Sequence, residues 1–226
     1  MDDPIRMAAL KLTYLPIAAR GFPIRFALRV AGRQFEDARL PREVLVSGRG
    51  PAGFSASFPL GQLPTLEIDG ELFTESVALS RWAAVGTPLY PQDPLDALRV
   101  EEVVAIIDEL WSKTPMARHL NLADPAALLA ARAHHVAIVA PRFLERLSAR
   151  VGSRGGPFVL PSGPSLADVW LTAFAVQVGS GAYWVPEGQP GAGGVPAGLL
   201  DPYPKLQACV DAFKAHPLFA EYGEPM

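Results

Sequence analysis

The sequence is poor in cysteine, in net charge and in long apolar runs. Cys209 is the only cysteine, so no disulfide can form within the chain, and a reducing compartment is the natural expectation. The net charge of -3 is too small to favour nucleic acid or an acidic membrane as a partner. No apolar stretch approaches the roughly 18 residues that cross a bilayer, and residues 1–4 lack the pattern of a signal peptide. We therefore expect a soluble, cytoplasmic protein that binds neither nucleic acid nor membrane.

What the chain does have is a large apolar fraction and a proline-rich break. Half of its 226 residues are hydrophobic, which is enough for one large or two small domains. Residues 86–94 contain three prolines and are interpreted as a linker. Strand and helix patterns mix before this linker, whereas every clear pattern after it is helical. The sequence thus predicts an α/β domain over residues 1–85 and an all-helical domain over residues 95–226.

The first domain shows a recognisable order of elements. Alternating apolar residues at 10–15 and at 34–40 predict two strands, and the helical periodicity that begins at Pro23 lies between them. Glycine and proline in residues 41–58 predict a short, irregular helix at most. Asp69-Gly70, between two more alternating stretches, is the strongest short hairpin signal. With the helix that follows, the order is that of a thioredoxin-like fold, a mixed four-stranded sheet with helices on both faces.

The second domain is predicted from apolar stripes at helical spacing. The helix that begins at Asp124-Pro125 should be interrupted by Pro141. Ser165 and Asp168 are assigned to capping the start of a helix that is apolar all round and therefore buried, and Cys209 is interpreted as a small buried hydrophobe. The predicted helices cover residues 95–112, 124–147, 165–176 and, as the last one, 203–215. His134 and His135 do not face alike on a helix, so we expect no metal site.

Four short segments are each a weak signal alone, but together, in this order and at this spacing, they are specific. They are Lys11-Leu12-Thr13-Tyr14 with Pro23-Ile24-Arg25; Gly61-Gln62-Leu63-Pro64-Thr65-Leu66-Glu67-Ile68-Asp69-Gly70 through Glu75-Ser76-Val77-Ala78; Ser165-Leu166-Ala167-Asp168; and Tyr203-Pro204-Lys205-Leu206 with His216-Pro217. Together they resemble a glutathione transferase, nearest the sigma class, over almost the whole chain. The resemblance implies a thioredoxin-like domain followed by an all-helical domain, a homodimer, glutathione as co-substrate and a hydrophobic electrophile as second substrate.

The resemblance also implies roles for single residues. Tyr14 would donate its hydroxyl to the glutathione sulfur, and Arg20 would add positive potential beside it. Gln62, Leu63 and Pro64, the last two joined by a cis bond, would contact the cysteinyl part. Glu75 and Ser76 would hold the γ-glutamyl end. The residues by themselves also allow plainer readings: Tyr14 as a core aromatic, Arg20 as a solvated loop arginine and Glu75-Ser76 as an ordinary helix cap.

The sequence departs from the sigma pattern in two places. The tryptophan and the lysine that grip the glycyl end are replaced by Pro51 and Ser55. The acidic residue that many members lend across the dimer falls on Ala105, although Asp108 lies almost one turn on and could reach the ammonium of glutathione. A solvated helix face is the plainer reading of Asp108.

The pocket for the electrophile is expected between Leu15 and Ile17 on one side and Trp111 and Met116 on the other. The alternative is that these side chains only pack against one another between the two domains. The implied function is conjugation of glutathione to hydrophobic electrophiles in detoxification, with peroxidase or isomerase activity as variants. The rival hypothesis is a non-catalytic carrier or structural protein of the same fold, like the sigma-related lens crystallins.

Overall fold

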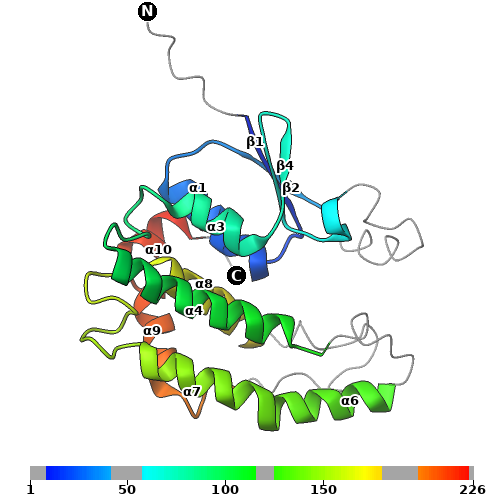
Figure 1. Ribbon diagram of the computed structural model, residues 1–226, viewed down its shortest axis with the longest axis vertical. Helices are drawn as coiled ribbons and strands as arrows, with labels where there is room; N and C mark the ends of the chain where they lie inside the picture. The colour runs from blue at the N-terminus through cyan, green and yellow to red at the C-terminus, as the bar shows by residue number, and fades with distance from the viewer. Residues whose placement is uncertain (1–8, 42–57, 116–124, 180–197, 224–226) are drawn as a thin grey trace, which may run out of the picture. The chain divides into compact units, whose positions relative to one another are not determined.

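The computed structural model describes residues 9–41, 58–115, 125–179 and 198–223. The chain divides into two compact units, Met1–Thr87 and Pro88–Met226. The first unit contains a sheet with α-helices, and the second is built from helices (Figure 1). The thioredoxin-like and all-helical architecture predicted from the sequence is confirmed.

The sheet of the first unit has the strand order β2-β1-β3-β4. Strand β1 (Leu10–Tyr14) pairs in parallel with β2 (Glu36–Arg39) and antiparallel with β3 (Thr65–Ile68), which pairs antiparallel with β4 (Glu71–Phe73). The parallel pair needs a crossover, and the helix α1 (Phe22–Val30) provides it.

The hairpin between β3 and β4 forms at the predicted turn. Asp69 and Gly70 have φ values of 49° and 90°, and Ile68 pairs with Glu71 directly across them. Two consecutive residues with positive φ are what a tight two-residue hairpin turn requires, which is why Asp-Gly occupies it. The chain then enters α3 (Ser76–Ala84), which packs against α1 (Figure 1). Most of the expected irregular helix at 41–58 lies outside the described residues.

The second unit is organised around the apolar helix α8 (Leu166–Gly179), which packs against α4 (Pro94–Ser112) and α9 (Pro204–Lys214). Every residue from Leu166 to Phe174 is buried, as expected for a helix that is apolar all round. Trp111 of α4 meets Trp170 and Phe174 of α8 edge-on, with ring centroids 6.1 and 5.7 Å apart. Such edge-to-face pairs add to the energy of burial alone.

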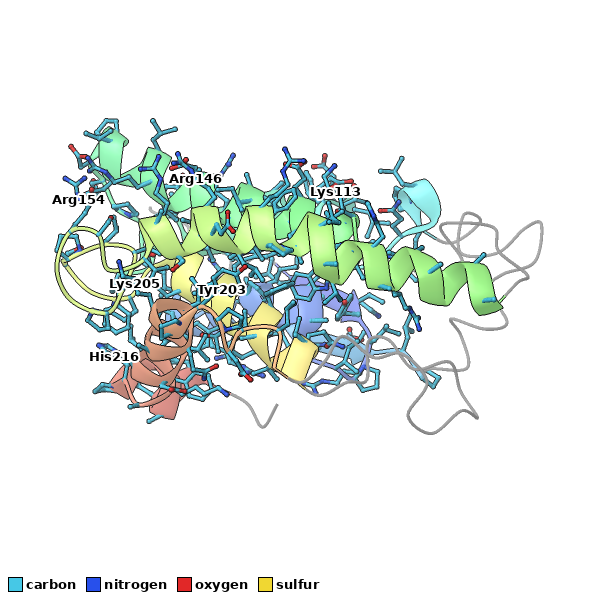
Figure 2. All side chains as sticks on the ribbon, turned by 90° about the horizontal axis from the view of Figure 1, so that it is seen from below. Lys113, Arg146, Arg154, Tyr203, Lys205 and His216 are labelled. Carbon is cyan, nitrogen blue, oxygen red and sulfur yellow. The ribbon has the colours of Figure 1, made fainter. Side chains whose placement is uncertain are left out.

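The prediction that the helix over residues 203–215 is the last one is wrong. His216-Pro217 does not end the helical part of the chain but starts a further helix, α10 (Pro217–Tyr222). Proline suits the first position of a helix, and the ring nitrogen Nδ1 of His216 accepts a hydrogen bond from the Leu218 amide at 3.2 Å. Figure 2 shows Tyr203 and His216 on either side of α9.

The predicted interruption at Pro141 takes the form of a wider helical turn. Between α6 (Pro125–His134) and α7 (Ala140–Arg150) lies the π-helical segment η4 (His135–Val139), in which the Ala140 amide donates to the carbonyl of His135. Proline has no amide hydrogen, and its ring clashes with the carbonyl four residues earlier. Adding a residue to the turn before Pro141 lets the helix continue.

A surface ion pair joins α4 to α7. Glu102 of α4 accepts hydrogen bonds from Nη2 of Arg146 at 2.5 Å and from Nη2 of Arg150 at 2.8 Å. Arg146 and Arg150 are spaced one helical turn apart, so both reach the same carboxylate; Arg146 is labelled in Figure 2. Pairs this exposed contribute little to stability, so the apolar contacts hold these helices together.

Asp168 of α8 is fully buried and accepts hydrogen bonds from several parts of the second unit. Its carboxylate takes the amide and the hydroxyl of Ser165 at 2.7 and 2.8 Å, the amide of Val159 at 3.0 Å and the thiol of Cys209 at 3.1 Å. Burial raises the pKa of Asp168, and these hydrogen bonds oppose the shift. Only half of the predicted capping box forms, because the Ser165 hydroxyl donates to Asp168. Cys209 is buried as expected, but it is also a donor.

Replacing Asp168 with alanine should leave the buried donors around it without an acceptor. We expect the free energy of unfolding to fall by about 3–5 kcal/mol, measured by urea denaturation. Asp211→Ala is the control, because Asp211 is exposed and accepts only a surface hydrogen bond from Gln207; its effect should stay within about 0.5 kcal/mol. Equal effects of the two substitutions would show that the Asp168 network does not stabilise the helical unit.

His135 should make stability depend on pH. Its side chain is 3% exposed, and burial, with a smaller effect of neighbouring His134, lowers its pKa to about 4. The unfolded chain has a histidine pKa of about 6.5, so between these values it binds more protons than the folded protein. The free energy of unfolding should therefore drop by up to about 3 kcal/mol as the pH falls through this window.

The measurement compares urea denaturation at neutral and mildly acidic pH for the native protein and His135→Gln, which should lose this part of the pH dependence. His134→Gln is the matched control, because His134 is exposed and should retain it. An unchanged slope in His135→Gln would contradict the assignment.

Candidate functional site

Tyr14 is the last residue of β1 and is 6% exposed. Its backbone carbonyl accepts a hydrogen bond from the Leu40 amide at 2.8 Å, which anchors the end of the strand to the chain beyond β2. The backbone of Gly21 passes so close that a Cβ atom there would lie 2.3 Å from Cδ1 of the Tyr14 ring. Gly21 has an ordinary φ of -78°, so the close approach, and not the backbone conformation, is what calls for glycine.

Leu63 and Pro64 lie at the same end of the sheet as Tyr14. Thr13 of β1 pairs with Thr65 of β3 in an antiparallel register. The next facing positions of the two strands are therefore Tyr14, which follows Thr13, and Pro64, which precedes Thr65. The Leu63-Pro64 bond is cis, as the resemblance implied. Pro64 is buried, Leu63 is half-buried, and Gln62 is exposed with an extended backbone. An exposed, extended segment beside a sheet is suited to pairing with the backbone of a peptide ligand.

Arg20 and Ser76 are in direct contact. Arg20 lies in a short 3-10 helix, η1 (Ala19–Gly21), and its Nη1 donates a hydrogen bond to the Ser76 hydroxyl at 3.2 Å. From the resemblance, Arg20 is expected beside the thiol of the cysteinyl residue and Ser76 at the γ-glutamyl end. The structure joins the loop after Tyr14 to the first residue of α3, where unpaired backbone amides favour a carboxylate.

Glu75 precedes α3 in a strained conformation. Its φ and ψ are 72° and 99°, and its side chain makes no capping hydrogen bond to the helix. Such a conformation costs about 1–3 kcal/mol in a residue other than glycine and is found most often at functional sites. Glu75 therefore occupies the N-cap position of α3 without capping it through its side chain, and the residue is exposed.

A buried arginine, Arg25, holds the loop that follows Tyr14. It donates hydrogen bonds to the backbone carbonyls of Leu15 and Ile17, both at 3.0 Å, and from Nε to the Asp37 carboxylate at 2.9 Å. Burial raises the pKa of Asp37, but hydrogen bonds from Arg25 and Arg39 outweigh burial and lower it. Sequence reasoning gave Arg25 and Asp37 no role. An arginine in the middle of the apolar run Phe22–Leu28 was the signal that could have identified Arg25.

The remaining predicted site residues are placed as follows. Leu15 is buried and Ile17 half-buried, and both belong to the loop that Arg25 holds. Asp108 is half-buried on α4, and Trp111 is buried among aromatic rings of the helical unit. Met116, like Pro51 and Ser55, lies outside the described residues. The electrophile pocket thus stays a prediction.

Two further observations concern the described residues. Within residues 9–41, 58–115, 125–179 and 198–223, no three histidine, cysteine, aspartate or glutamate side chains gather as metal ligands. None of the helices in those ranges combines the length and apolarity needed to cross a membrane.

Comparisons with known proteins agree with this arrangement. No protein-family model matches the chain. The chain is 29% identical over 168 residues to a glutathione S-transferase of Anopheles gambiae, covering 73% of this chain and 77% of the relative. It is 26% identical over 215 residues to glutathione S-transferase S1 of Drosophila melanogaster, covering 94% and 76%.

The fold is shared with a solved structure of prostaglandin synthase D of Nilaparvata lugens, at a TM-score of 0.75 and 19% identity, over 96% of this chain and 99% of that one. The similarity in sequence covers most of both chains for the two transferases, and the fold extends over nearly all of this one. These similarities in sequence, together with the shared fold, support the glutathione transferase superfamily for this chain.

Proposed function

We propose that this protein is a tyrosine-type glutathione transferase, nearest the sigma class, that conjugates glutathione to hydrophobic electrophiles. The observation that carries the proposal is the Arg20–Ser76 hydrogen bond. It joins the loop that follows Tyr14 to the N-terminus of α3, which supports a single site in the first unit for the glutathione sulfur and the γ-glutamyl carboxylate.

The reaction needs the thiolate of glutathione, because the thiolate is the nucleophile. A thiol with a pKa of about 8.5 is only a few per cent ionised at neutral pH. Lowering that pKa by about two units requires roughly 2.7 kcal/mol of selective stabilisation of the thiolate. A hydrogen bond from the hydroxyl of Tyr14, a buried residue, with the charge of Arg20 nearby, is of the right size.

The tripeptide would extend along the end of the sheet. Gln62, Leu63 and Pro64 would contact its cysteinyl part through the extended backbone. Ser76 and the amides at the start of α3 would bind the γ-glutamyl carboxylate, and Glu75 would pair with the ammonium group. Asp108 is proposed as a further partner of the ammonium, supplied across a dimer.

A homodimer is supported by apolar side chains left exposed in each unit. Leu72 and Phe73 on the edge strand β4 are 38% and 37% exposed, and Leu95 and Leu98 on α4 are 53% and 63% exposed. An open, apolar strand edge is usually covered in natural proteins, and clustered apolar surface marks interfaces. We propose that a second copy of the chain covers these surfaces.

We also propose that the enzyme acts in the cytoplasm, in detoxification.

The electrophile site would use the apolar side chains of Leu15 and Ile17, together with Trp111 and Met116. Isomerase activity is a second candidate, because a solved structure with the same fold is a prostaglandin synthase. The replacement of the expected tryptophan and lysine by Pro51 and Ser55 favours the rival hypothesis of a non-catalytic carrier. Retention on immobilised glutathione without turnover of a chloronitrobenzene would support the carrier, and turnover would support the enzyme.

Substituting Tyr14 with phenylalanine removes the hydroxyl and keeps the ring. The pKa of bound glutathione should rise by about 1–2 units, and conjugation near neutral pH should fall about 10–100-fold. Thiolate absorbance as a function of pH and steady-state rates measure the two effects. Tyr90→Phe is the matched control, because the Tyr90 hydroxyl is paired with Glu101 in the helical unit. A Tyr14→Phe enzyme with the native thiol pKa and rate would rule out the tyrosine mechanism.

Substituting Ser76 with alanine should weaken glutathione binding more than catalysis. Loss of a hydrogen bond to a charged group costs about 1.5–3 kcal/mol, so KM for glutathione should rise about 10–100-fold while kcat changes little. Ser80→Ala on the same helix is the control, since the Ser80 hydroxyl donates to the backbone of Val77. If kcat fell and KM did not, Ser76 would not be a carboxylate ligand.

A further inference from the structure

Arg25 carries a positive charge in the middle of the core of the first unit. Its side chain is fully buried on α1, among neighbours such as Ile24 and Phe26 that are also fully buried. A buried charge is costly unless it is paired and its donors are satisfied. The pairing with Asp37 offsets the charge, and the bonds to the carbonyls of Leu15 and Ile17 occupy further donors.

Those acceptors are arranged around Tyr14. Leu15 and Ile17 are the first and third residues after Tyr14, so the guanidinium fixes the backbone that directly follows Tyr14. The carbon Cζ of Arg25 also lies 5.7 Å from the centroid of the Tyr14 ring, within the range of a cation–π contact. One side chain thus holds both the backbone and the ring of the residue proposed to act on the sulfur.

We propose that Arg25 is a positioning residue that holds the Tyr14 phenol in the orientation needed to donate its hydroxyl to the glutathione sulfur. This inference rests on the proposed function. Two physical effects contribute. The fork of the guanidinium restricts the loop in a way that a single ammonium cannot reproduce. A positive charge beside the ring also makes the phenol O–H a stronger hydrogen-bond donor, which strengthens its hydrogen bond to the thiolate sulfur.

The plainer alternative is that Arg25 only holds α1 to β2. A purely structural arginine would change the melting temperature but not the ionisation of the thiol in the enzyme that remains folded. The test must therefore read the thiol itself, in addition to stability.

The experiment uses Arg25→Lys, which keeps the charge but loses the fork, and Arg25→Met, which loses both, with glutathione as the probe. We expect the pKa of bound glutathione to rise by about one unit and kcat at about pH 6.5 to fall about 10-fold, with KM for glutathione changed less than about 3-fold. Arg25→Met should show the larger change. Folded variants with the native thiol pKa and kcat would overturn the inference.

A double-mutant cycle separates this inference from the proposed function. In a Tyr14→Phe background, adding Arg25→Lys should change the thiol pKa by less than about 0.3 unit, because the two residues act as one group. Fully additive effects would show that Arg25 does not act through Tyr14. If Tyr14→Phe alone left the thiol pKa unchanged, the proposed function would fail. If Tyr14→Phe raised it and Arg25→Lys did not, only the present inference would fail.

Should the Arg25 variants not fold, Asp37→Asn provides a milder route, because the amide oxygen can still accept a hydrogen bond from Arg25 Nε while the carboxylate charge is lost. This variant should raise the pKa of bound glutathione and lower kcat at about pH 6.5 by about 3-fold. Arg39→Met is the matched control, because Arg39 contacts the other oxygen of Asp37 at 2.7 Å and is itself exposed. The same thiol pKa in both variants as in the native enzyme would count against the proposal.

Discussion

The charge of Arg25 is buried in the first unit, and the need to pair it organises the structure around it. The guanidinium meets a carboxylate on β2 and two carbonyls between β1 and η1, so one side chain ties a helix, a strand and a loop together. Because a buried ion left unpaired is strongly destabilising, these elements have little freedom to move apart. The proposed site depends on that restriction, since Tyr14 ends the strand from which the loop begins.

In the helical unit, Asp168 likewise ties several segments together, although its charge is opposite to that of Arg25. Its carboxylate joins the start of α8 to the preceding loop and to α9. The apolar surface of α8 supplies most of the burial energy, but such contacts are non-directional. The hydrogen bonds of Asp168 add the directional part. In the described residues, each unit therefore combines an extensive apolar core with a fully buried, hydrogen-bonded charged side chain, Arg25 or Asp168.

A strained residue and a close backbone contact both lie near the proposed glutathione site. Glu75 adopts a backbone conformation unusual for a residue with a side chain, and Gly21 approaches the Tyr14 ring too closely for any side chain. Such features persist only where the surrounding fold over-determines them. The paired Arg25 and the contact between α1 and α3 provide that surrounding rigidity, so binding would require little reorganisation of the backbone.

Much of the fold could be predicted from the sequence, because local signals determine it. The alternation of β1, the Asp69-Gly70 turn and the apolar surface of α8 each depend on neighbouring residues, and the order of elements then indicated the fold. The expected roles of Tyr14, Pro64 and Ser76 came from resemblance and remain proposals. The prediction from local signals failed at α10, where proline started a helix although it was expected to end the last one; the interruption at Pro141 was predicted, but not that it would be a π turn.

Only the tertiary structure decided which groups meet. The partners Arg25 and Asp37 are 12 residues apart in the chain, Cys209 and Asp168 are 41 apart, and Arg20 and Ser76 are 56 apart. No periodicity of the sequence encodes such pairs, because a buried polar side chain takes the acceptor that the folded chain brings within reach. The sequence by itself determined the elements and their order, whereas the pairing of the buried charges, and with it the support behind Tyr14, arose only when those elements packed.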